Sequence, residues 1–416
     1  MPIEVVTDDS NLDADGSAQT LVGTEGGPDA IVSMACSQVG VGADGGVAQS
    51  IGIATRAAQF VVSNQSTNGA GTSECQSHSD TKLIAMPTVD NTTIDATATL
   101  GTIAGNAIPL TWNTTHATNA YDYALMCFSQ MDDVDAREIL ITANGNTDVD
   151  LAWVAPPDLL VIASSFTLAA ASSSEAHSHM NLYFAARNDR GTTHGSVSGS
   201  AEDSSGSSDA SRGASNSDLT IRSDASSGRD SNWNVAAHLD PQDTGGINGY
   251  RLTTTNKGTS GNAYFYVLAI RGVLAEVVDG DAPTSVGDYS LANTTGFQPD
   301  AILTCGQGRG AFGTAANYHV SVGMHDRQER GAHMWAREDH GSGTTENERR
   351  WSTDVHRVEG PVDSVNNLVT VNRGFSMGRI DYEATTVTAT AYDWSCLMMA
   401  DRPKLRGARS RSRGRN

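Results

Sequence analysis

The chain has 416 residues, of which 38% are apolar and only 18% are charged, and its formal net charge is −21. Glycine is frequent and long runs of Leu, Glu, Lys and Gln are missing, which disfavours a helical enzyme and favours many short strands. No run approaches the roughly 20 apolar residues of a membrane span, and the start MPIEVVTDDS lacks the basic and apolar regions of a signal peptide.

The charge is unevenly distributed along the chain. The last fifteen residues contain seven basic residues and no acid, which leaves 20 basic against 48 acidic residues, a net charge of −28, in residues 1–401. The body should therefore repel nucleic acid and anionic membranes, whereas the C-terminal arm should bind an acidic surface of a partner. The basic residues of the arm are Arg402, Lys404, Arg406, Arg409, Arg411, Arg413 and Arg415.

The kinds of charged residue are also biased. Only three residues are lysine, and Asp outnumbers Glu by 35 to 13. An acidic, lysine-poor surface is typical of a protein that is soluble in molar salt, where the screening length falls to about 3 Å. A GC-rich genome, which favours Arg over Lys, is the alternative explanation.

The acidic segment near the start resembles the first half of a calcium-binding loop. Asp9, Asn11, Asp13 and Asp15 alternate and are followed by Gly16, but Val22 stands where the bidentate Glu is expected. We expect a solvated acidic loop here and no cofactor. A calcium site at these residues is the alternative.

Three segments begin with Pro-Asp followed by an apolar run, at Pro28, Pro157 and Pro299. Three further segments share an aromatic apolar pattern typical of a buried strand, and they span 120–126, 263–269 and 391–397. In the first and third copies, the proline of the Pro-Asp pair and the tyrosine at the second position of the aromatic segment are 93 residues apart. In the second copy they are 107 residues apart. The matching distances indicate an internal repeat of about 136 residues.

The repeat predicts an all-β protein of three tandem, diverged β-sandwich domains of jelly-roll type with a short basic C-terminal arm. We place the domains at 1–136, 137–273 and 274–401 and the arm at 402–416. The opening and closing strands of each domain are apolar on both faces, so we expect them side by side at the centre of a sheet. The longer second domain is attributed to a Ser/Gly/Asp-rich insertion at 196–217, which is expected to be a mobile surface loop.

The five cysteines are predicted to be buried free thiols. Cys36 and Cys305 lie in opening strands, and Cys127 and Cys396 lie in closing strands. A disulfide between Cys36 and Cys127, and another between Cys305 and Cys396, is the alternative.

Two polar groups could carry chemistry in the second and third domains. Glu175, His177 and His179 alternate, so a strand would place them on one face, where they could bind a transition metal; polar surface residues are the alternative. The stretch from 325 to 350 is dense in charged residues, but no Gly-x-Ser-x-Gly, His-Glu-x-x-His or phosphate-loop motif accompanies it. We interpret it as a binding interface, since Arg and Trp are favoured at interfaces. The residues of this expected interface are Trp335, Arg337, Arg349, Arg350 and Trp351.

The third opening, Thr295-Gly296-Phe297-Gln298-Pro299-Asp300, resembles the Gly-Phe-Gln-Pro-Asp opening of β-sandwich domains in virion proteins of tailed viruses. Gly374-Phe375-Ser376-Met377-Gly378 is similar to a later Gly-Phe-x-x-Gly element of those domains. The resemblance covers most of residues 276–400 and reaches the other two domains only through the repeat. It implies a location at the virion surface, in a tail or head structure, and an assembly or adhesive role without catalytic residues. Together with the acidic surface it implies a virus of a halophilic host.

Three functional hypotheses follow. The first is a non-enzymatic virion structural protein, forming a tail appendage or a head decoration or turret, that homo-oligomerises and contacts the acidic surfaces of other virion proteins. The second is an adhesin for host glycans or another surface receptor, with Trp112, Trp233 and Trp335 as exposed platforms for sugars. The third is a polysaccharide depolymerase, which needs paired carboxylates in a cleft.

Overall fold

The computed structural model describes most of the chain. The described residues are 2–9, 18–23, 26–37, 42–67, 75–87, 94–113, 121–165, 173–176, 178–201, 210–221, 233–257, 263–281, 283–307, 313–316, 318–338, 347–353, 356–359, 367–387 and 393–402. All regular elements within these ranges are β-strands, and all of the strand pairs are antiparallel, which confirms the all-β class.

Each repeat forms a sandwich of one seven-stranded and one four-stranded sheet, and the strand order is the same in all three repeats. In the first repeat, the large sheet has the strand order β1 (Ile3–Asp9), β11 (Asp122–Phe128), β3 (Ala30–Cys36), β5 (Val47–Thr55), β6 (Gln59–Ser66), β7 (Cys75–Asp80), β15 (Ser173–Ala176). Its small sheet has the order β2 (Ala18–Val22), β10 (Ala107–Asn113), β9 (Ile94–Leu100), β8 (Ile84–Pro87). In the second repeat, the large sheet has the strand order β12 (Asp133–Ile141), β22 (Ala263–Arg271), β14 (Leu159–Ser164), β16 (Ser178–Asn188), β17 (Gly191–Ala201), β18 (Ala210–Ser215), β26 (Gly313–Ala316). Its small sheet has the order β13 (Gly145–Asp150), β21 (Gly249–Lys257), β20 (Trp233–His238), β19 (Leu219–Ile221). In the third repeat, the large sheet has the strand order β23 (Val273–Asp281), β33 (Asp393–Asp401), β25 (Ala301–Gly306), β27 (Tyr318–Asp326), β28 (Gly331–Glu338), β29 (Asn347–Ser352), β4 (Gly42–Gly45). Its small sheet has the order β24 (Gly287–Ala292), β32 (Arg379–Thr386), β31 (Asn367–Ser376), β30 (His356–Glu359).

The opening and closing strands pair with each other inside each large sheet, as the sequence predicts. In the first repeat β3 pairs with β11, and Ile31 lies opposite Cys127. Strands β14 and β22, and β25 and β33, pair in the same register in the other repeats. These strands are apolar on both faces because one face packs on the small sheet of the same repeat and the other packs at the centre of the molecule.

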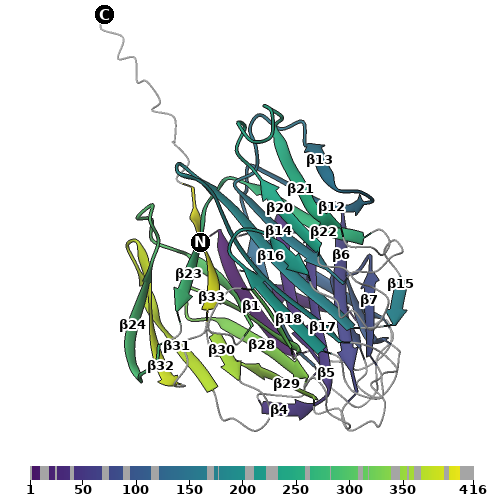
Figure 1. Ribbon diagram of the computed structural model, residues 1–416, viewed down its shortest axis with the longest axis vertical. Coiled ribbons are helices and arrows are strands. Elements are labelled where there is room, and N and C mark those ends of the chain that lie inside the picture. The colour runs from purple at the N-terminus through teal and green to yellow at the C-terminus, as the bar shows by residue number, and fades with distance from the viewer. Residues whose placement is uncertain are drawn as a thin grey trace, which may run out of the picture.

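The last strand of each large sheet comes from a different repeat. Strand β4 of the first repeat pairs with β29 of the third, β15 of the second pairs with β7 of the first, and β26 of the third pairs with β18 of the second. Figure 1 shows β4 beside β29 and β15 beside β7 at the margin of the molecule. Each repeat therefore gives one short strand to a neighbour and receives one from the other neighbour.

Each repeat gives its exchanged strand to one neighbour. The first strand of the repeat also packs against a hairpin of that neighbour. Strand β1 packs on β27 and β28, β12 packs on β5 and β6, and β23 packs on β16 and β17. The first repeat thus contacts the third as the second contacts the first. The three repeats form a closed ring with approximate threefold symmetry, and the small sheets lie on its outside, as β24, β31 and β32 do in Figure 1.

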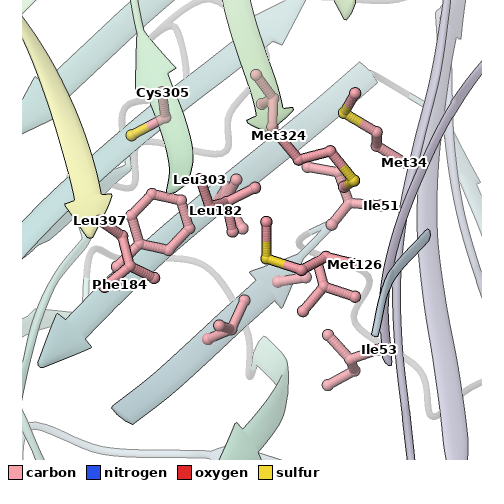
Figure 2. Close-up of a cluster of buried hydrophobic side chains, with 14 of the residues drawn as sticks. Met34, Ile51, Ile53, Met126, Leu182, Phe184, Leu303, Cys305, Met324 and Leu397 are labelled. Atoms are coloured by element: carbon pink, nitrogen blue, oxygen red, sulfur yellow. The ribbon is translucent and has the colours of Figure 1, made fainter. Parts of the chain in front are cut away.

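A single apolar core joins the three large sheets at the centre of the ring. It contains Met34, Ile51, Ile53 and Met126 of the first repeat, Leu182 and Phe184 of the second, and Leu303, Cys305, Met324 and Leu397 of the third (Figure 2). Separate cores lie between the large and small sheets of the individual repeats, for example around Trp112 and Trp233. Because burial of apolar area is the main stabilising contribution to folding, the central core holds the three sandwich repeats against one another.

The central core includes hydrogen bonds between repeats at the level of β27. The Tyr318 hydroxyl donates to Gln49 Oε1 at 2.9 Å and accepts from Asn64 Nδ2 at 2.7 Å. All three residues are buried. Gly199 of β17 also lies close to the Tyr318 side chain, where a Cβ atom would come within 2.4 Å of Tyr318 Cε2. Small residues on β17 thus allow the aromatic ring to fit between the repeats.

The expectation of a mobile loop at 196–217 is wrong for the described part of that segment. Residues up to Ala201 belong to β17, and residues from Ala210 to Ser215 form β18. Residues Ser196, Ser198 and Ser200 are buried. A sequence of Ser, Gly and Ala carries no apolar periodicity, yet here these small residues line a tight interface between sheets.

Two further expectations about the chain can be compared with the structure. The expected boundary at 136 falls inside β12, which begins the second repeat at Asp133, whereas the boundary near 273 coincides with the start of β23.

All five cysteines are free and buried. Cys36 points into the central core while Cys127 points between the sheets of its own repeat, so the side chains lie on opposite faces and cannot be bridged.

The ring has two distinct ends. Asp29, Asp158 and Asp300 lie at the starts of the opening strands, level with the ends of the closing strands, and we name this the Pro-Asp end. The exchanged strands β4, β15 and β26 lie towards the opposite end, which we name the exchange end. Pro2 and Arg402, the first and last described residues, both lie at the Pro-Asp end.

Candidate functional site

The aspartate of each Pro-Asp pair closes its repeat at the Pro-Asp end. Asp29 Oδ2 accepts a hydrogen bond from Met131 N at 3.0 Å, Asp158 Oδ2 from Gly272 N at 2.8 Å, and Asp300 Oδ2 from Asp401 N at 2.9 Å. Each donor lies just beyond or at the end of the closing strand. The carboxylate therefore fixes where the chain leaves one repeat and enters the next segment.

An arginine completes each of these carboxylate sites. Arg56 lies 3.2 Å from Asp29, Arg187 lies 2.9 Å from Asp158, and Arg327 lies 3.3 Å from Asp300. In the first two repeats the guanidinium also donates Nε to the carbonyl of the Pro-Asp proline, at 3.2 Å to Pro28 O and 3.1 Å to Pro157 O. We call the three units the Asp–Arg clasps.

The clasps present positive charge outward. The side chains of Arg56, Arg187 and Arg327 are 55%, 23% and 42% exposed, whereas those of their Asp partners are 27%, 0% and 11% exposed. The carboxylates thus lie beneath the guanidinium groups. Each repeat accordingly shows a held arginine at the Pro-Asp end.

The C-terminal arm begins at the second of these clasps. Arg402 Nη2 donates to Asp158 Oδ1 at 3.2 Å, so a residue that follows the third repeat is bound by the second. The Arg402 side chain is 44% exposed. The other predicted arm residues, from Lys404 to Arg415, lie outside the described residues, and their binding to a partner stays a prediction.

A separate charged cluster joins the first and third repeats. Arg330 Nε donates to Asp326 Oδ2 at 2.8 Å, and its Nη2 donates to Glu4 Oε2 at 3.3 Å. Asp326 Oδ2 also accepts from Val5 N at 2.8 Å. Glu4 and Asp326 are buried, so this cluster ties the N-terminal strand to the last repeat and closes the ring.

Of the interface residues expected in the third repeat, Trp351 packs in the central core between the repeats, and Trp335 points to the opposite face of its sheet. Trp335 and Trp351 are buried, which excludes contact between either ring and an external partner. The guanidinium of Arg337 lies 5.8 Å from the Trp335 ring. Arg349 and Arg350 belong to β29, and their backbones pair with Asp44 and Ala43 of the exchanged strand β4.

The exposed sugar platforms proposed for the adhesin hypothesis are wrong. Trp112, Trp233 and Trp335 are all fully buried, because alternation along their strands points them into the sandwich cores. An open hollow of about 510 Å³ does lie at the small sheet of the third repeat. Arg373, Arg379, Asp288 and Asp381 line it, and Arg379 Nε lies 3.0 Å from Asp381.

The expected metal ligands fall partly outside the described residues. Glu175 lies on β15 in the first repeat's sheet, His179 lies on β16 in the second repeat's sheet, and His177 lies outside the described residues between them. Of the calcium ligands, Asp9 ends β1, and Asn11, Asp13 and Asp15 are outside the described residues. In the part of the chain that the structure describes, no three His, Cys, Asp or Glu side chains gather as a metal site would require.

The two motifs that carry the virion-protein resemblance contact each other. Gln298 Nε2 donates to Phe375 O at 2.7 Å, and Gly378 N donates to Phe297 O at 3.1 Å. Gly296 and Gly378 have φ angles of 76° and 74°, a conformation that favours glycine. These motifs therefore shape a turn contact at the Pro-Asp end.

The clasp arginines and the ring-closing cluster are functional candidates that the sequence reasoning did not identify. Arg56, Arg187 and Arg327 follow their aspartates by 27, 29 and 27 residues, so the repeat itself contained the signal. The ring-closing cluster had no such signal, because the contacts of Arg330 and Asp326 with the N-terminal strand depend on closure of the ring.

Comparison of the chain with protein-family models, with curated proteins and with solved structures gave no match.

Proposed function

We propose that the chain is a non-enzymatic structural protein of a tailed-virus particle, exposed as a head decoration or turret or as a tail appendage. The observation that carries the proposal is the closed ring of three sandwich repeats that exchange strands. A ring built in this way is a rigid block, because no repeat can move away without breaking a sheet and opening the common core.

Three other features support the same role. One chain supplies three related outer faces, so diverged repeats can contact different neighbours. The basic arm offers several Arg–carboxylate pairs to an acidic subunit, and such pairs hold best when they act together and are shielded from solvent. The contact between the two Gly-Phe motifs gives the family resemblance a structural role in the third repeat.

Immunogold labelling of purified particles tests the proposal. An antibody against the recombinant chain should label particles from the culture that produces the protein, either on the head or on the tail. A head label would identify a decoration or turret, and a tail label an appendage. If the chain is present in the lysate but the particles carry neither label nor chain, the proposal is wrong.

A glycan-binding adhesin is the second candidate, and the hollow in the third repeat is the observation that favours it. Its paired Arg and Asp side chains offer both donors and acceptors to saccharide hydroxyls. Binding on a glycan array that is lost in Arg379→Ala and kept in Arg56→Ala would support this function. Equal binding by both variants, or none by the native chain, would count against it.

A further inference from the structure

The Pro-Asp end holds the links between the repeats and the start of the C-terminal arm. The first described residue, the links between repeats and Arg402 all lie there. The arm begins at Arg402, which is bound to Asp158 at this end of an otherwise strongly acidic body. The first residue of the arm is therefore held at the Pro-Asp end.

The folded surface of this end also suits a protein partner. The clasps place Arg56 and Arg327 outward, and Arg402 is 44% exposed. Arginines that are already held by carbonyls and carboxylates lose little conformational entropy when they bind. Acids are present too, but Asp132 and Asp133 pair with Arg271.

Three exposed apolar side chains also lie at this end. The three most exposed large apolar side chains described are Val154, Met377 and Val22, at 82%, 73% and 64%. One comes from each repeat, and each lies in or beside a loop of the Pro-Asp end: Gly23 N, next to Val22, donates to Asn106 O, and Gly378 N, next to Met377, donates to Phe297 O. Val286, at 61%, lies before β24, at the end of that strand remote from the Pro-Asp end.

We infer that the Pro-Asp end is the attachment face of the protein and that it docks on an acidic protein subunit of the particle, with the exchange end directed outward. Arginine and exposed apolar residues together fit a protein surface better than a nucleic acid, which the acidic body repels. Arg402, Val154, Met377 and the clasp arginines contact the partner. This inference rests on the proposed function and adds an orientation and a contact face to it.

Cysteine accessibility in assembled particles tests the orientation. The five native cysteines are buried, so a new surface cysteine is the one that a maleimide reagent labels. Val154→Cys and Met377→Cys report on the Pro-Asp end, and Val286→Cys is the matched control at the other end of the small sheet. In the purified chain all three variants should be labelled.

In intact particles, Val154→Cys and Met377→Cys should lose labelling while Val286→Cys keeps it. Labelling of all three, loss at all three, or loss at Val286→Cys alone would overturn the orientation. Chain analysis of the same particles separates this result from the proposed function. If the particles lack the chain altogether, the virion role is contradicted and the attachment face with it.

Discussion

At the scale of single residues, the three clasp aspartates share a position but differ in burial. Asp158 is fully buried and accepts hydrogen bonds from Gly272 N, Arg187 and Arg402. Asp29 has the corresponding bonds to Met131 N and Arg56, but its side chain is 27% exposed. Water can replace lost partners at Asp29 and cannot do so at Asp158.

Asp158→Asn should therefore lower the free energy of unfolding by about 2–3 kcal/mol, the range for a lost bond to a charged buried group. Asp29→Asn is the control and should cost about 1 kcal/mol or less, as exposed ion pairs do. Urea unfolding in molar salt measures both values. Equal losses in the two variants would show that burial of the clasp does not decide its strength.

His194 gives the protein a component of acid sensitivity. Burial, reinforced by His238, lowers the pKa of His194 to about 4, and its Nδ1 lies 2.7 Å from the Tyr183 hydroxyl. The unfolded chain has the ordinary histidine pKa of about 6.5, so between these values it binds a proton that the folded chain does not bind. Folding stability should be complete above pH 6.5 and should fall as the pH drops towards 4, by about 3 kcal/mol from this residue.

His194→Gln should remove that contribution. The variant should lose less stability than the native chain between pH 6.5 and pH 5, a window in which ordinary carboxylates stay ionised. Chemical unfolding of the two proteins at several pH values measures the difference. Parallel curves over the window would contradict a neutral, buried His194.

At the scale of elements, the sheet arrangement shows what the sequence could and could not predict. The opening and closing strands were predictable because two-sided burial requires continuous apolar runs. The exchanged strands were not, since Gly42–Gly45, Ser173–Ala176 and Gly313–Ala316 are four-residue segments without apolar alternation. Their strand structure depends on an edge offered by another repeat, which no local pattern records.

The same reasoning explains the error at 196–217 and the tryptophans. Strand β17 is buried through small residues, so its sequence looks like a solvated loop. Trp335 and Trp351 lie in a charged stretch whose sequence suggests an outer interface, but strand alternation buries both rings. The clasp arginines were within reach of a closer comparison of the three repeats.

The close approach of β17 and β27 predicts a strong effect of a single methyl group. Gly199→Ala would place Cβ 2.4 Å from the Tyr318 ring, so the repeats must separate or the ring must move. We expect a loss of about 1–3 kcal/mol in unfolding free energy. In a Tyr318→Ala background the same change should cost less, and a double-mutant cycle by urea unfolding measures the coupling; full additivity would contradict the contact.

At the scale of the whole molecule, the net charge of −21 acts on a single compact ring. Mutual repulsion among the acids destabilises the compact state at low ionic strength and is screened as salt rises. The unfolding temperature should therefore rise by several degrees between 0.1 M and 2 M KCl, measured by calorimetry. Potassium chloride is preferred to sulfate, which stabilises proteins by exclusion from their surface. A falling unfolding temperature would mean that the ion pairs outweigh the repulsion.

One chain closes its own ring, with β4 of the first repeat in the sheet of the third. Asp44 lies opposite Arg349 in that pairing, at a separation that suits a disulfide. The measurement is oxidation of the double variant Asp44→Cys with Arg349→Cys, followed by non-reducing electrophoresis and peptide mass spectrometry. Asp44→Cys with Asn347→Cys, two residues out of register, is the control. We expect a disulfide within one chain for the first pair and little for the second. No disulfide, or one that joins two chains, would contradict closure of the ring within one chain.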